Sequence, residues 1–406
     1  MNGEVKGMKE MIRQAASVYT TPFYLFNLER FTERIRQIQE ILGQQVNLCY
    51  AVKANPFLIS VAADKVKRLE VCSPGEFAIC EKNGISMDKI VLSGVYKEEK
   101  EIRRILSAYG EKGIYTIESP GQLKILAKVS EEIGIRISVL LRLTSGNQFG
   151  MDAKKIHEII RDRSKYSQLQ IRGIQYYSGT QKKQKKVMEK ELTMLDVLCE
   201  ELKDKWGFHV KELEYGPGFF FPYFQKDDVS DTREVMTEFR QILDRMKFQG
   251  KVTLEIGRYL AADCGVYVTR IVDLKENEGK KYAIVDGGIH HLNYYGQTMA
   301  MKIPFYSQLD GNTLEERNRQ QDVEMVTVCG ALCTVSDVLV KNLPLTGEIL
   351  GDILVFENTG AYSVTEGIYL FLSRAMPQIL FWSENEGLKL IREPVETSKF
   401  NSEMKR

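Results

Sequence analysis

The residue with the clearest chemical potential lies where a predicted strand ends. An apolar run over 49–52 leads into Lys53, and Pro56 follows shortly after. Proline ends the strand because it has no N–H to donate to a neighbouring strand. A lysine at a strand end, sheltered by apolar neighbours, can lose its proton and form an imine with a carbonyl compound. An isolated lysine here would more often be an ordinary surface residue, so the interpretation depends on what accompanies it.

Further polar groups follow other predicted strands. An acid, an arginine, an aromatic residue and glycine-bearing turns occur at these strand ends: Glu70, Arg142, Tyr177-Ser178-Gly179-Thr180, Gly216-Pro217-Gly218 and Glu255-Ile256-Gly257-Arg258. If the strands are parallel, their carboxyl ends meet at one face. The set would then suit a phosphorylated aromatic aldehyde.

Each residue type has a physical use toward such a ligand. Gly179 and Gly218 let backbone N–H groups approach phosphate oxygens, and the planar fork of Arg258 can bind the same phosphate. Glu255 can keep a pyridine nitrogen protonated, and Tyr177 can stack on the ring. Taken singly, each has an ordinary structural explanation. The joint arrangement in chain order is what those explanations leave out.

Strands and helices alternate through the first two thirds of the chain. Eight short apolar, β-branched runs are predicted strands: 46–52, 69–72, 90–93, 114–117, 135–143, 171–177, 211–215 and 252–255. Segments with helical periodicity lie between them: 57–66, 76–83, 98–108, 122–133, 154–163, 186–205 and 232–246. This alternation predicts an α/β fold with a parallel sheet. Eight such strands predict a (β/α)8 barrel of the TIM type, with its chemistry at the C-terminal ends of the strands.

The pattern changes near residue 262. Apolar runs now follow one another without helices between them, which predicts a mainly antiparallel β-domain. These runs are 265–274, 281–286, 323–329, 352–356 and 378–382. A strand-like run at 21–26 precedes the barrel and could join that domain. We therefore expect a barrel over residues 28–262 and a β-domain formed by 1–27 with 263–406.

Composition limits the classes of protein that the chain can represent. Its 406 residues favour two domains, and its net charge of +1 gives no bulk field for nucleic acid or a membrane surface. It has no run of 18 apolar residues and no apolar secretory segment near its start. Seven scattered cysteines and only four histidines fit reduced thiols in the cytoplasm and no metal centre.

In this order the motifs resemble those of the fold-type III pyridoxal-phosphate decarboxylases. This group includes diaminopimelate and ornithine decarboxylases and, more distantly, alanine racemase. The resemblance spans roughly residues 21–382. The motifs that carry it are Tyr-Ala-Val-Lys-Ala-Asn (50–55), Glu-Val-Cys-Ser-Pro-Gly-Glu (70–76), Gln-Phe-Gly-Met (148–151), Ser-Gly-Thr-Gln (178–181), Gly-Pro-Gly-Phe (216–219), Glu-Ile-Gly-Arg (255–258), Val-Asp-Gly-Gly (285–288), Cys-Thr-Val-Ser-Asp (333–337) and Gly-Ala-Tyr (360–362).

The resemblance implies pyridoxal 5'-phosphate as cofactor and α-decarboxylation of an amino acid as reaction. It assigns covalent binding of the cofactor to Lys53 and the ring-nitrogen contact to Glu255. The other cofactor-binding residues that it implies are Glu70, Arg142, Tyr177, Ser178, Gly179, Thr180, Gly218, Gly257, Arg258 and Tyr362. Cys333 would reach into the partner subunit's site and act as proton donor there. A homodimer with shared active sites is therefore expected.

Three departures from the family pattern bear on cofactor and substrate. Tyr177 stands where the decarboxylases usually have a ring-stacking histidine, and Pro217 removes one N–H from the phosphate loop. Thr334 replaces the acid that follows the cysteine in enzymes acting on ornithine or diaminopimelate. The stretch 285–291 also lacks the arginine typical of diaminopimelate decarboxylases. A distal ammonium would lack its usual counter-charge, which disfavours ornithine and lysine.

The candidate substrate-binding residues are Thr334, Asp337, His290 and His291. These motifs look more like a secondary-metabolism subgroup that resembles the butirosin-pathway enzyme and acts on a glutamyl group tethered to an acyl carrier protein. The lysine-rich run 182–186 could receive an acidic carrier, although a solvated helix start is the simpler explanation for that run alone. No metal is expected at the histidine pair, because neighbours on a strand point to opposite faces.

Four alternatives remain open. The first is a decarboxylase of free diaminopimelate or a related diamino acid. The second is a racemase, against which Glu255 argues, since racemases normally place an arginine at the ring nitrogen. The third is a non-catalytic regulator, like the inactive relatives of ornithine decarboxylase; intact Lys53, Glu255 and Arg258 argue against it, while Pro217 keeps it open. The fourth is a cofactor carrier, which would normally be a barrel alone.

Overall fold

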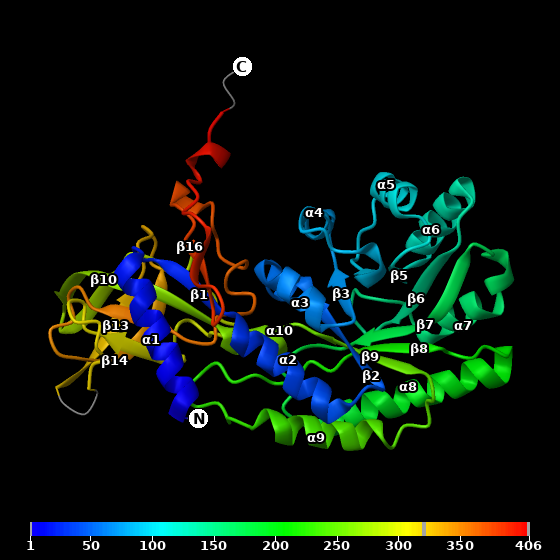
Figure 1. The fold of residues 1–406 in the computed structure, drawn as a ribbon, viewed down its shortest axis with the longest axis horizontal. Coiled ribbons are helices and arrows are strands. Elements are labelled where there is room, and N and C mark those ends of the chain that lie inside the picture. The colour runs from blue at the N-terminus through cyan, green and yellow to red at the C-terminus, as the bar shows by residue number, and fades with distance from the viewer. Residues whose placement is uncertain (1, 319–321, 404–406) are drawn as a thin grey trace. The chain divides into compact units, whose positions relative to one another are not determined.

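A computed structural model describes residues 2–318 and 322–403, which divide into two compact units. The first unit comprises Thr32–Phe221 and Ser230–Leu260 and contains the barrel strands. The second contains the remaining described residues (Figure 1). Segment Pro222–Val229, which lies within the sequence range expected for the barrel, groups with the second unit.

The first unit is a closed barrel of eight parallel strands, so the predicted TIM-type architecture is confirmed. Its strands follow the chain order and are β2 (Val46–Ala51), β3 (Arg68–Val71), β4 (Ile90–Leu92), β5 (Ile114–Ile117), β6 (Ile137–Leu143), β7 (Leu169–Tyr177), β8 (Glu212–Gly216) and β9 (Lys251–Ile256). The ring closes where β9 pairs with β2, from Val46↔Val252 to Tyr50↔Ile256.

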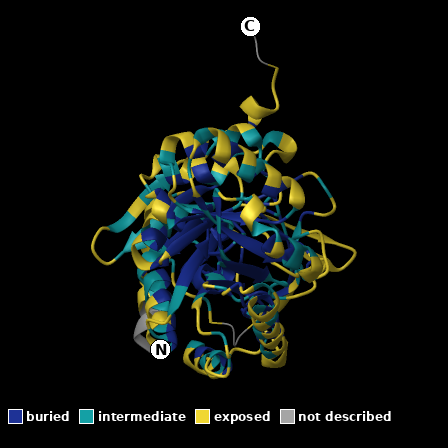
Figure 2. Ribbon diagram, turned by 90° about the vertical axis from the view of Figure 1, so that its right-hand side faces the viewer, coloured by how far each residue is buried: buried dark blue, intermediate teal, exposed yellow. Residues whose placement is uncertain are grey.

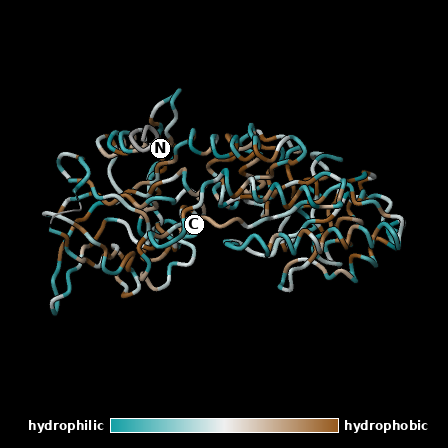
Figure 3. Tube along the Cα trace, turned by 90° about the horizontal axis from the view of Figure 1, so that it is seen from below, coloured by the Kyte–Doolittle hydropathy of each residue, from teal (hydrophilic) through white to brown (hydrophobic). Residues whose placement is uncertain are grey.

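Helices surround these strands (Figure 1). They are α3 (Ile59–Lys65), α4 (Pro74–Lys82), α5 (Glu99–Tyr109), α6 (Pro120–Ile133), α7 (Ala153–Arg161), α8 (Lys185–Trp206) and α9 (Thr232–Leu243). Figure 2 shows the buried strands at the centre, ringed by helices whose outer faces are exposed. Along the helices, hydrophobic and hydrophilic residues alternate (Figure 3), so each helix turns an apolar face inward.

Two of these helices begin two residues earlier than the sequence predicts. At the starts of α4 and α6, Ser73 and Ser119 accept hydrogen bonds from the N–H groups of Glu76 and Gln122. A proline occupies the first position of each helix, where its missing N–H has no cost. Such a serine cap stabilises a helix by about 1 kcal/mol, which fixes both starts next to the carboxyl ends of β3 and β5.

The second unit is built on a nine-stranded sheet whose main path runs β14-β13-β11-β10-β1-β16-β17, with β15 pairing with β10 and β12. Its strands are β1 (Phe23–Asn27), β10 (Gly265–Asn277), β11 (Lys280–Val285), β12 (Tyr306–Leu309), β13 (Val323–Cys329), β14 (Val338–Thr346), β15 (Ile353–Phe356), β16 (Gln378–Ser383) and β17 (Gly387–Arg392). The pairs β1–β16 and β11–β13 are parallel, and the others are antiparallel. Strands β12, β14 and β17 were not predicted.

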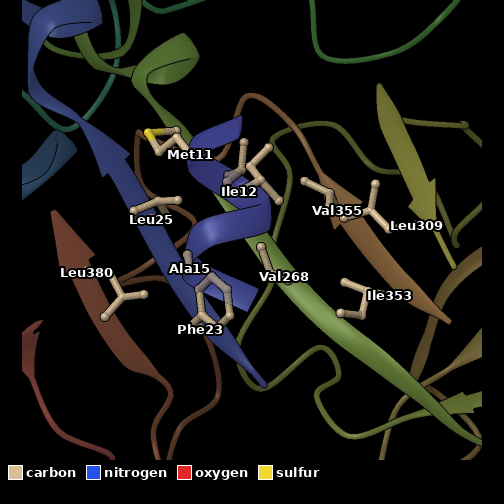
Figure 4. Packing of buried hydrophobic residues seen from close by; sticks show 11 residues of the cluster. Met11, Ile12, Ala15, Phe23, Leu25, Val268, Leu309, Ile353, Val355 and Leu380 are labelled. Carbon is tan, nitrogen blue, oxygen red and sulfur yellow. The ribbon is translucent and has the colours of Figure 1, made fainter. Parts of the chain in front are cut away.

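Helix α1 (Asn2–Val18), also not predicted, covers one face of this sheet. Its buried residues Met11, Ile12 and Ala15 pack in one cluster with Phe23 and Leu25 of β1 (Figure 4). The cluster continues through buried residues of the neighbouring strands: Val266, Val268, Leu309, Ile353, Val355 and Leu380. The remaining helices are α2 (Leu28–Leu42) and α10 (Arg258–Ala261). No helix in the described ranges is long and apolar enough to cross a membrane.

Candidate active site

Polar residues occupy alternate positions of several barrel strands, and alternate positions point into the barrel. The interior-facing polar residues are Arg68 and Glu70 of β3, Gln175 of β7, Glu212 and Glu214 of β8, and Thr253 and Glu255 of β9. All but Glu255 are classed as buried, and the side chain of Glu255 is only 7% exposed. The barrel interior therefore contains an acidic network over much of its depth.

Lys53 lies at the C-terminal end of the barrel, in the short 3-10 turn Val52–Ala54 after β2. Its Nζ donates to Glu70 Oε2 at 2.7 Å and lies 3.5 Å from Glu255 Oε1. The Asn55 side chain accepts from the Phe57 N–H at 3.0 Å and caps the following turn, so the backbone leaves the strand in a fixed direction. The Lys53 side chain is 39% exposed, whereas that of Glu70 is 2% exposed. A partly open amine is thus held by two buried carboxyl groups.

Glu70 and Glu255 share this cation and titrate as a pair. Burial raises the pKa of Glu255, and the charge of Glu70 raises it further. Burial also acts to raise the pKa of Glu70, but the Lys53 ammonium, helped by hydrogen bonds, outweighs it and the pKa of Glu70 is lowered. Of the two carboxyl groups, Glu255 therefore binds a proton more readily than Glu70.

Residues that could hold a phosphate group form a cradle at the ends of β7, β8 and β9. The Arg258 guanidinium donates from Nε to Thr180 Oγ1 at 3.2 Å. Gly218 has a left-handed backbone with φ of +61°, and a Cβ built on it would stand 2.0 Å from the carbonyl oxygen of Gly179. Its own carbonyl accepts from the Lys182 N–H at 2.9 Å. An arginine fork, a hydroxyl and closely packed glycine backbone fit a phosphate in chemistry and shape.

Two other glycines bring strand ends together around this cradle. A Cβ on Gly257 would lie 2.8 Å from the Cβ of Ala54, so glycine allows the end of β9 to approach the Lys53 turn. A Cβ on Gly216 would lie 2.5 Å from Cδ2 of Tyr177, so glycine also leaves room for that ring. Burial raises the pKa of Tyr177 above its ordinary value, which keeps the phenol neutral. A neutral aromatic ring at this place fits the predicted stacking contact.

Arg142, at the end of β6, has a partner that the sequence analysis missed. Its Nη1 lies 3.1 Å from Oε1 of the buried Glu118, and its guanidinium lies 4.8 Å from the ring centroid of Phe149. The Gln-Phe-Gly-Met motif folds back on β6, since the Met151 N–H donates to the Arg142 carbonyl at 2.9 Å. The motif therefore holds the arginine in place from both sides.

Ser178 was expected to bind the cofactor, but its hydroxyl contacts another side chain of the barrel unit. Its hydroxyl donates to the buried carboxylate of Glu191, which also accepts from Tyr215 Oη at 2.6 Å and Lys182 Nζ at 2.8 Å. The Lys182 side chain is only 8% exposed, so the expectation that the whole run 182–186 presents lysines to a partner is wrong at its first residue. Glu191 gave no signal in sequence, because it lies within the periodic pattern of α8.

The remaining predicted residues lie in the second unit. Cys333 and Thr334 belong to the loop between β13 and β14, where Cys333 is exposed and Val335 is 99% exposed. Asp337 closes the base of this loop: its carboxylate accepts from the N–H groups of Leu332 at 2.7 Å and Ile289 at 2.8 Å. Tyr362 has a left-handed backbone with φ of +65°. The roles of these residues stay predictions.

The expected geometry of the histidine pair is wrong. His290 and His291 lie in a turn after β11, not on a strand, and their ring centroids are 3.8 Å apart. Both are buried. His291 lies 3.0 Å from Tyr267 Oη and 2.9 Å from the Ala375 carbonyl. Burial lowers the pKa of His290 to about 4 and that of His291 to about 3. Within the described residues, no group of three or more His, Cys, Asp or Glu side chains could hold a metal ion.

Replacing Gly218 with alanine is expected to weaken cofactor binding roughly tenfold or more, since the strain of a displaced left-handed loop costs about 1–3 kcal/mol. The added Cβ would collide with backbone of the cradle, not with a mobile side chain. Gly84→Ala is the matched control, because Gly84 has a similar φ of +65° and open space around its Cβ position. Absorbance titration with the cofactor measures both affinities. Equal losses in the two variants would contradict a specific role for the cradle.

The fold and the site define a class of protein: a TIM-type barrel whose strand ends carry a lysine beside two buried carboxyl groups, together with an arginine, a hydroxyl and glycine turns that fit a phosphate. The family described as pyridoxal-dependent decarboxylase, pyridoxal binding domain, matches residues 28–262, and the chain belongs to this family. The protein is therefore a carboxy-lyase with pyridoxal phosphate as cofactor.

The similarity to known relatives extends beyond this domain and covers most of the chain. The L-glutamyl-[BtrI acyl-carrier protein] decarboxylase of Niallia circulans is 27% identical over 402 residues, covering 92% of this chain and 91% of the relative. The diaminopimelate decarboxylase of Aquifex aeolicus is 23% identical over 402 residues, covering 94% and 91%.

Solved structures share the fold. The diaminopimelate decarboxylase of Methanocaldococcus jannaschii superposes with a TM-score of 0.81 at 21% identity, covering 95% of this chain and 92% of that one. The lysine/ornithine decarboxylase of Vibrio vulnificus, complexed with putrescine, gives a TM-score of 0.79 at 18% identity, covering 93% and 98%.

Proposed function

We propose that the protein removes the α-carboxyl group of an aminoacyl substrate whose distal end is an acyl group carried by an acyl carrier protein. The observation that carries this proposal is the position of Asp337. Both of its oxygens accept backbone N–H groups at the base of the 330–337 loop. The side chains at the tip of that loop, Cys333 and Thr334, are uncharged, so this loop offers no carboxylate to a distal ammonium.

The cofactor, when bound, supplies an electron-poor ring that accepts the electron pair left as CO2 departs. Lys53 would bind its aldehyde, and the Glu70 carboxylate, 2.7 Å from Nζ, would orient the amine toward it. Burial and the charge of Glu70 raise the pKa of Glu255, so its carboxyl group would keep a proton at the ring nitrogen. Arg258, Thr180, Gly179 and Gly218 bind the phosphate. The group is then fixed at both ends.

A second copy of the chain is proposed to complete each site. The tip of the 330–337 loop is highly exposed and has a braced base, which suits a segment that inserts into a partner. The partner copy's Cys333 would return a proton to the α-carbon of the substrate, as a thiol can act as general acid. Thr334, His290 and His291 are proposed to line the substrate side, and Tyr362 is proposed to contact the phosphate of the cofactor.

A carrier protein would dock beside the cradle, on the residues just before α8 and on the first turns of that helix. Lys183, Lys186 and Lys190 are exposed there, while Lys185 pairs with Glu238 at 2.9 Å. Three exposed cations would attract an acidic carrier and speed its association.

All seven cysteines of the chain are free thiols, which supports a reducing, cytoplasmic setting.

Free diaminopimelate is the second candidate substrate. It is favoured by the diaminopimelate decarboxylases among the relatives, which include enzymes of Vibrio cholerae at 26% and Pseudomonas fluorescens at 26% identity. Against it stands the same neutral loop tip, which leaves a second ammonium without a counter-charge from this segment.

The two candidates predict different results in an assay of CO2 release. The cofactor-loaded protein is given free glutamate, diaminopimelate, ornithine, lysine, arginine, and glutamate as a carrier-protein thioester. We expect release from the thioester alone. The matched variant Thr334→Asp restores an acid at the loop tip and should lower turnover of the thioester without affecting cofactor content. Release from free diaminopimelate at a comparable rate would reject the tethered substrate.

A further inference from the structure

Gln175 of β7 joins two carboxyl groups inside the barrel. Its side chain is fully enclosed, with the residue 1% exposed. Its Nε2 donates to Glu214 Oε1 at 3.0 Å and to Glu255 Oε2 at 3.1 Å. A primary amide nitrogen carries two N–H bonds, so both are used by these acids. One amide therefore bridges side chains from the next two strands of the ring, β8 and β9.

Glu214, at one end of this bridge, is itself held by other side chains inside the barrel. Glu214 is 0% exposed, and its Oε2 lies 3.8 Å from Nη1 of Arg68. Arg68 is itself bound to Glu212, which also accepts from Thr253 Oγ1 at 2.8 Å. Burial and the nearby Glu255 raise the pKa of Glu214. The acid to which Gln175 is tied therefore has little freedom to move.

The other end of the bridge meets the residue proposed to contact the cofactor ring. Glu255 uses Oε2 for Gln175, while its Oε1 faces Lys53. A carboxyl group that accepts a fixed N–H at one oxygen has its plane and direction set. Glutamine suits this place because it donates toward both acids. A glutamate would instead add a third buried acid between them.

We infer that Gln175 is a positioning residue: it aims Glu255 at the ring nitrogen of the cofactor, from a base formed by Glu214. The inference rests on the proposed role of Glu255 and extends it to Gln175, which hydrogen-bonds Glu255. Without the amide, the Glu255 carboxyl is held only from the side of Lys53 and Glu70, so it can turn away from the ring nitrogen and hold the proton there less firmly. Such a change lowers the pH at which the ring nitrogen loses its proton.

Gln175→Met tests this inference, since methionine keeps the length and removes both donors. We expect kcat to fall about tenfold, as for loss of one hydrogen bond to a charged group, with little change in KM. The second readout is the NMR signal of cofactor labelled with 15N in the ring, followed against pH. In the variant this nitrogen should lose its proton at a lower pH than in the parent protein.

Thr116→Val is the matched control. Thr116 is 0% exposed in the barrel and hydrogen-bonds Ser93 Oγ at 3.0 Å, so its loss removes a buried hydrogen bond from the same interior without touching Glu255. In the control variant, the ring nitrogen should lose its proton at the same pH as in the parent protein. If Gln175→Met shifts it no more than Thr116→Val does, the positioning role is overturned, whatever happens to kcat.

A second variant keeps the test valid if Gln175→Met fails to fold. Glu214→Leu removes the base of the bridge and should shift the nitrogen titration in the same direction, by a smaller amount. Glu255→Gln separates the two proposals. If Glu255→Gln changes neither turnover nor the nitrogen signal, the role of Glu255 fails and this inference falls with it. Suppose instead that Glu255→Gln alters turnover or the nitrogen signal, while the Gln175 and Glu214 variants leave the nitrogen signal unchanged. Then only the positioning role of Gln175 is rejected.

Discussion

Replacing Lys53 with alanine is expected to abolish CO2 release, by roughly 10³-fold or more, because no other amine takes over its covalent role. The same change removes the cation 2.7 Å from Glu70 and 3.5 Å from Glu255. The pKa of Glu70 should then rise, since the Lys53 charge is what lowers it. Turnover by the cofactor-loaded variant is measured as CO2 release under single-turnover conditions, with covalent cofactor binding followed by absorbance.

The Lys53→Arg variant tests the positive charge of Lys53 separately from its ability to form a covalent bond. An arginine keeps a positive charge beside the two acids but stays protonated, so it cannot bind an aldehyde covalently. We expect this variant to keep the fold and to be as inactive as Lys53→Ala. Partial recovery of the alanine variant by a small added amine would support the covalent role. Normal activity in either variant would reject it.

Replacing Glu255 with glutamine is expected to lower kcat about 10²–10³-fold, comparable to the loss of a preorganised electrostatic contact in other enzymes. Glutamine has nearly the same shape, and its carbonyl can still accept from Gln175. It cannot supply a proton to the ring nitrogen, so the ring becomes a poorer acceptor of electrons. The measurements are kcat, KM and the amount of cofactor bound per chain.

Glu76→Gln provides the comparison for this experiment. Glu76 is a half-buried acid at the start of α4, and it accepts from the Cys72 N–H at 2.6 Å. Its neutralisation changes an acid near the same strand ends without changing the partner of Lys53. A Glu255→Gln variant no slower than Glu76→Gln would show that Glu255 is not the ring-nitrogen contact.

The barrel could be predicted from sequence because strand-like segments with apolar residues alternate with segments of helical periodicity over most of its length. The strands of the β-domain were harder to recognise. Strand β14 carries Pro344, which argues against a strand, yet β14 lies at the end of the sheet path, where a proline is tolerated. Helix α1 was overlooked because its role depends on β1, which gives Met11 and Ile12 a surface to pack on.

The site was predictable where a motif ends a strand and unpredictable where polar groups meet across strands. Lys53, Gly218 and Arg258 stand at such ends. Gln175 and Glu214 have no local signal, because each is one of several polar residues in its strand. A comparison of registers finds them: Gln175 pairs with Glu214 between β7 and β8. The prediction for the histidine pair was wrong for a different reason, because strand β11 ends at Val285 and does not extend to His290 and His291.

The position of β1 has a consequence for how the protein is made. The barrel strands follow one another along the chain, so they can pair as they leave the ribosome. Strand β1 is synthesised before all of them, yet its sheet neighbours β10 and β16 come only after the whole barrel. Until then its apolar segment Phe23–Asn27 has two open edges, which is a hazard for aggregation. Helix α1 is made first and packs against β1, so it can shelter this strand through the delay. A chain that stops before Gln378 would leave one of these edges open permanently.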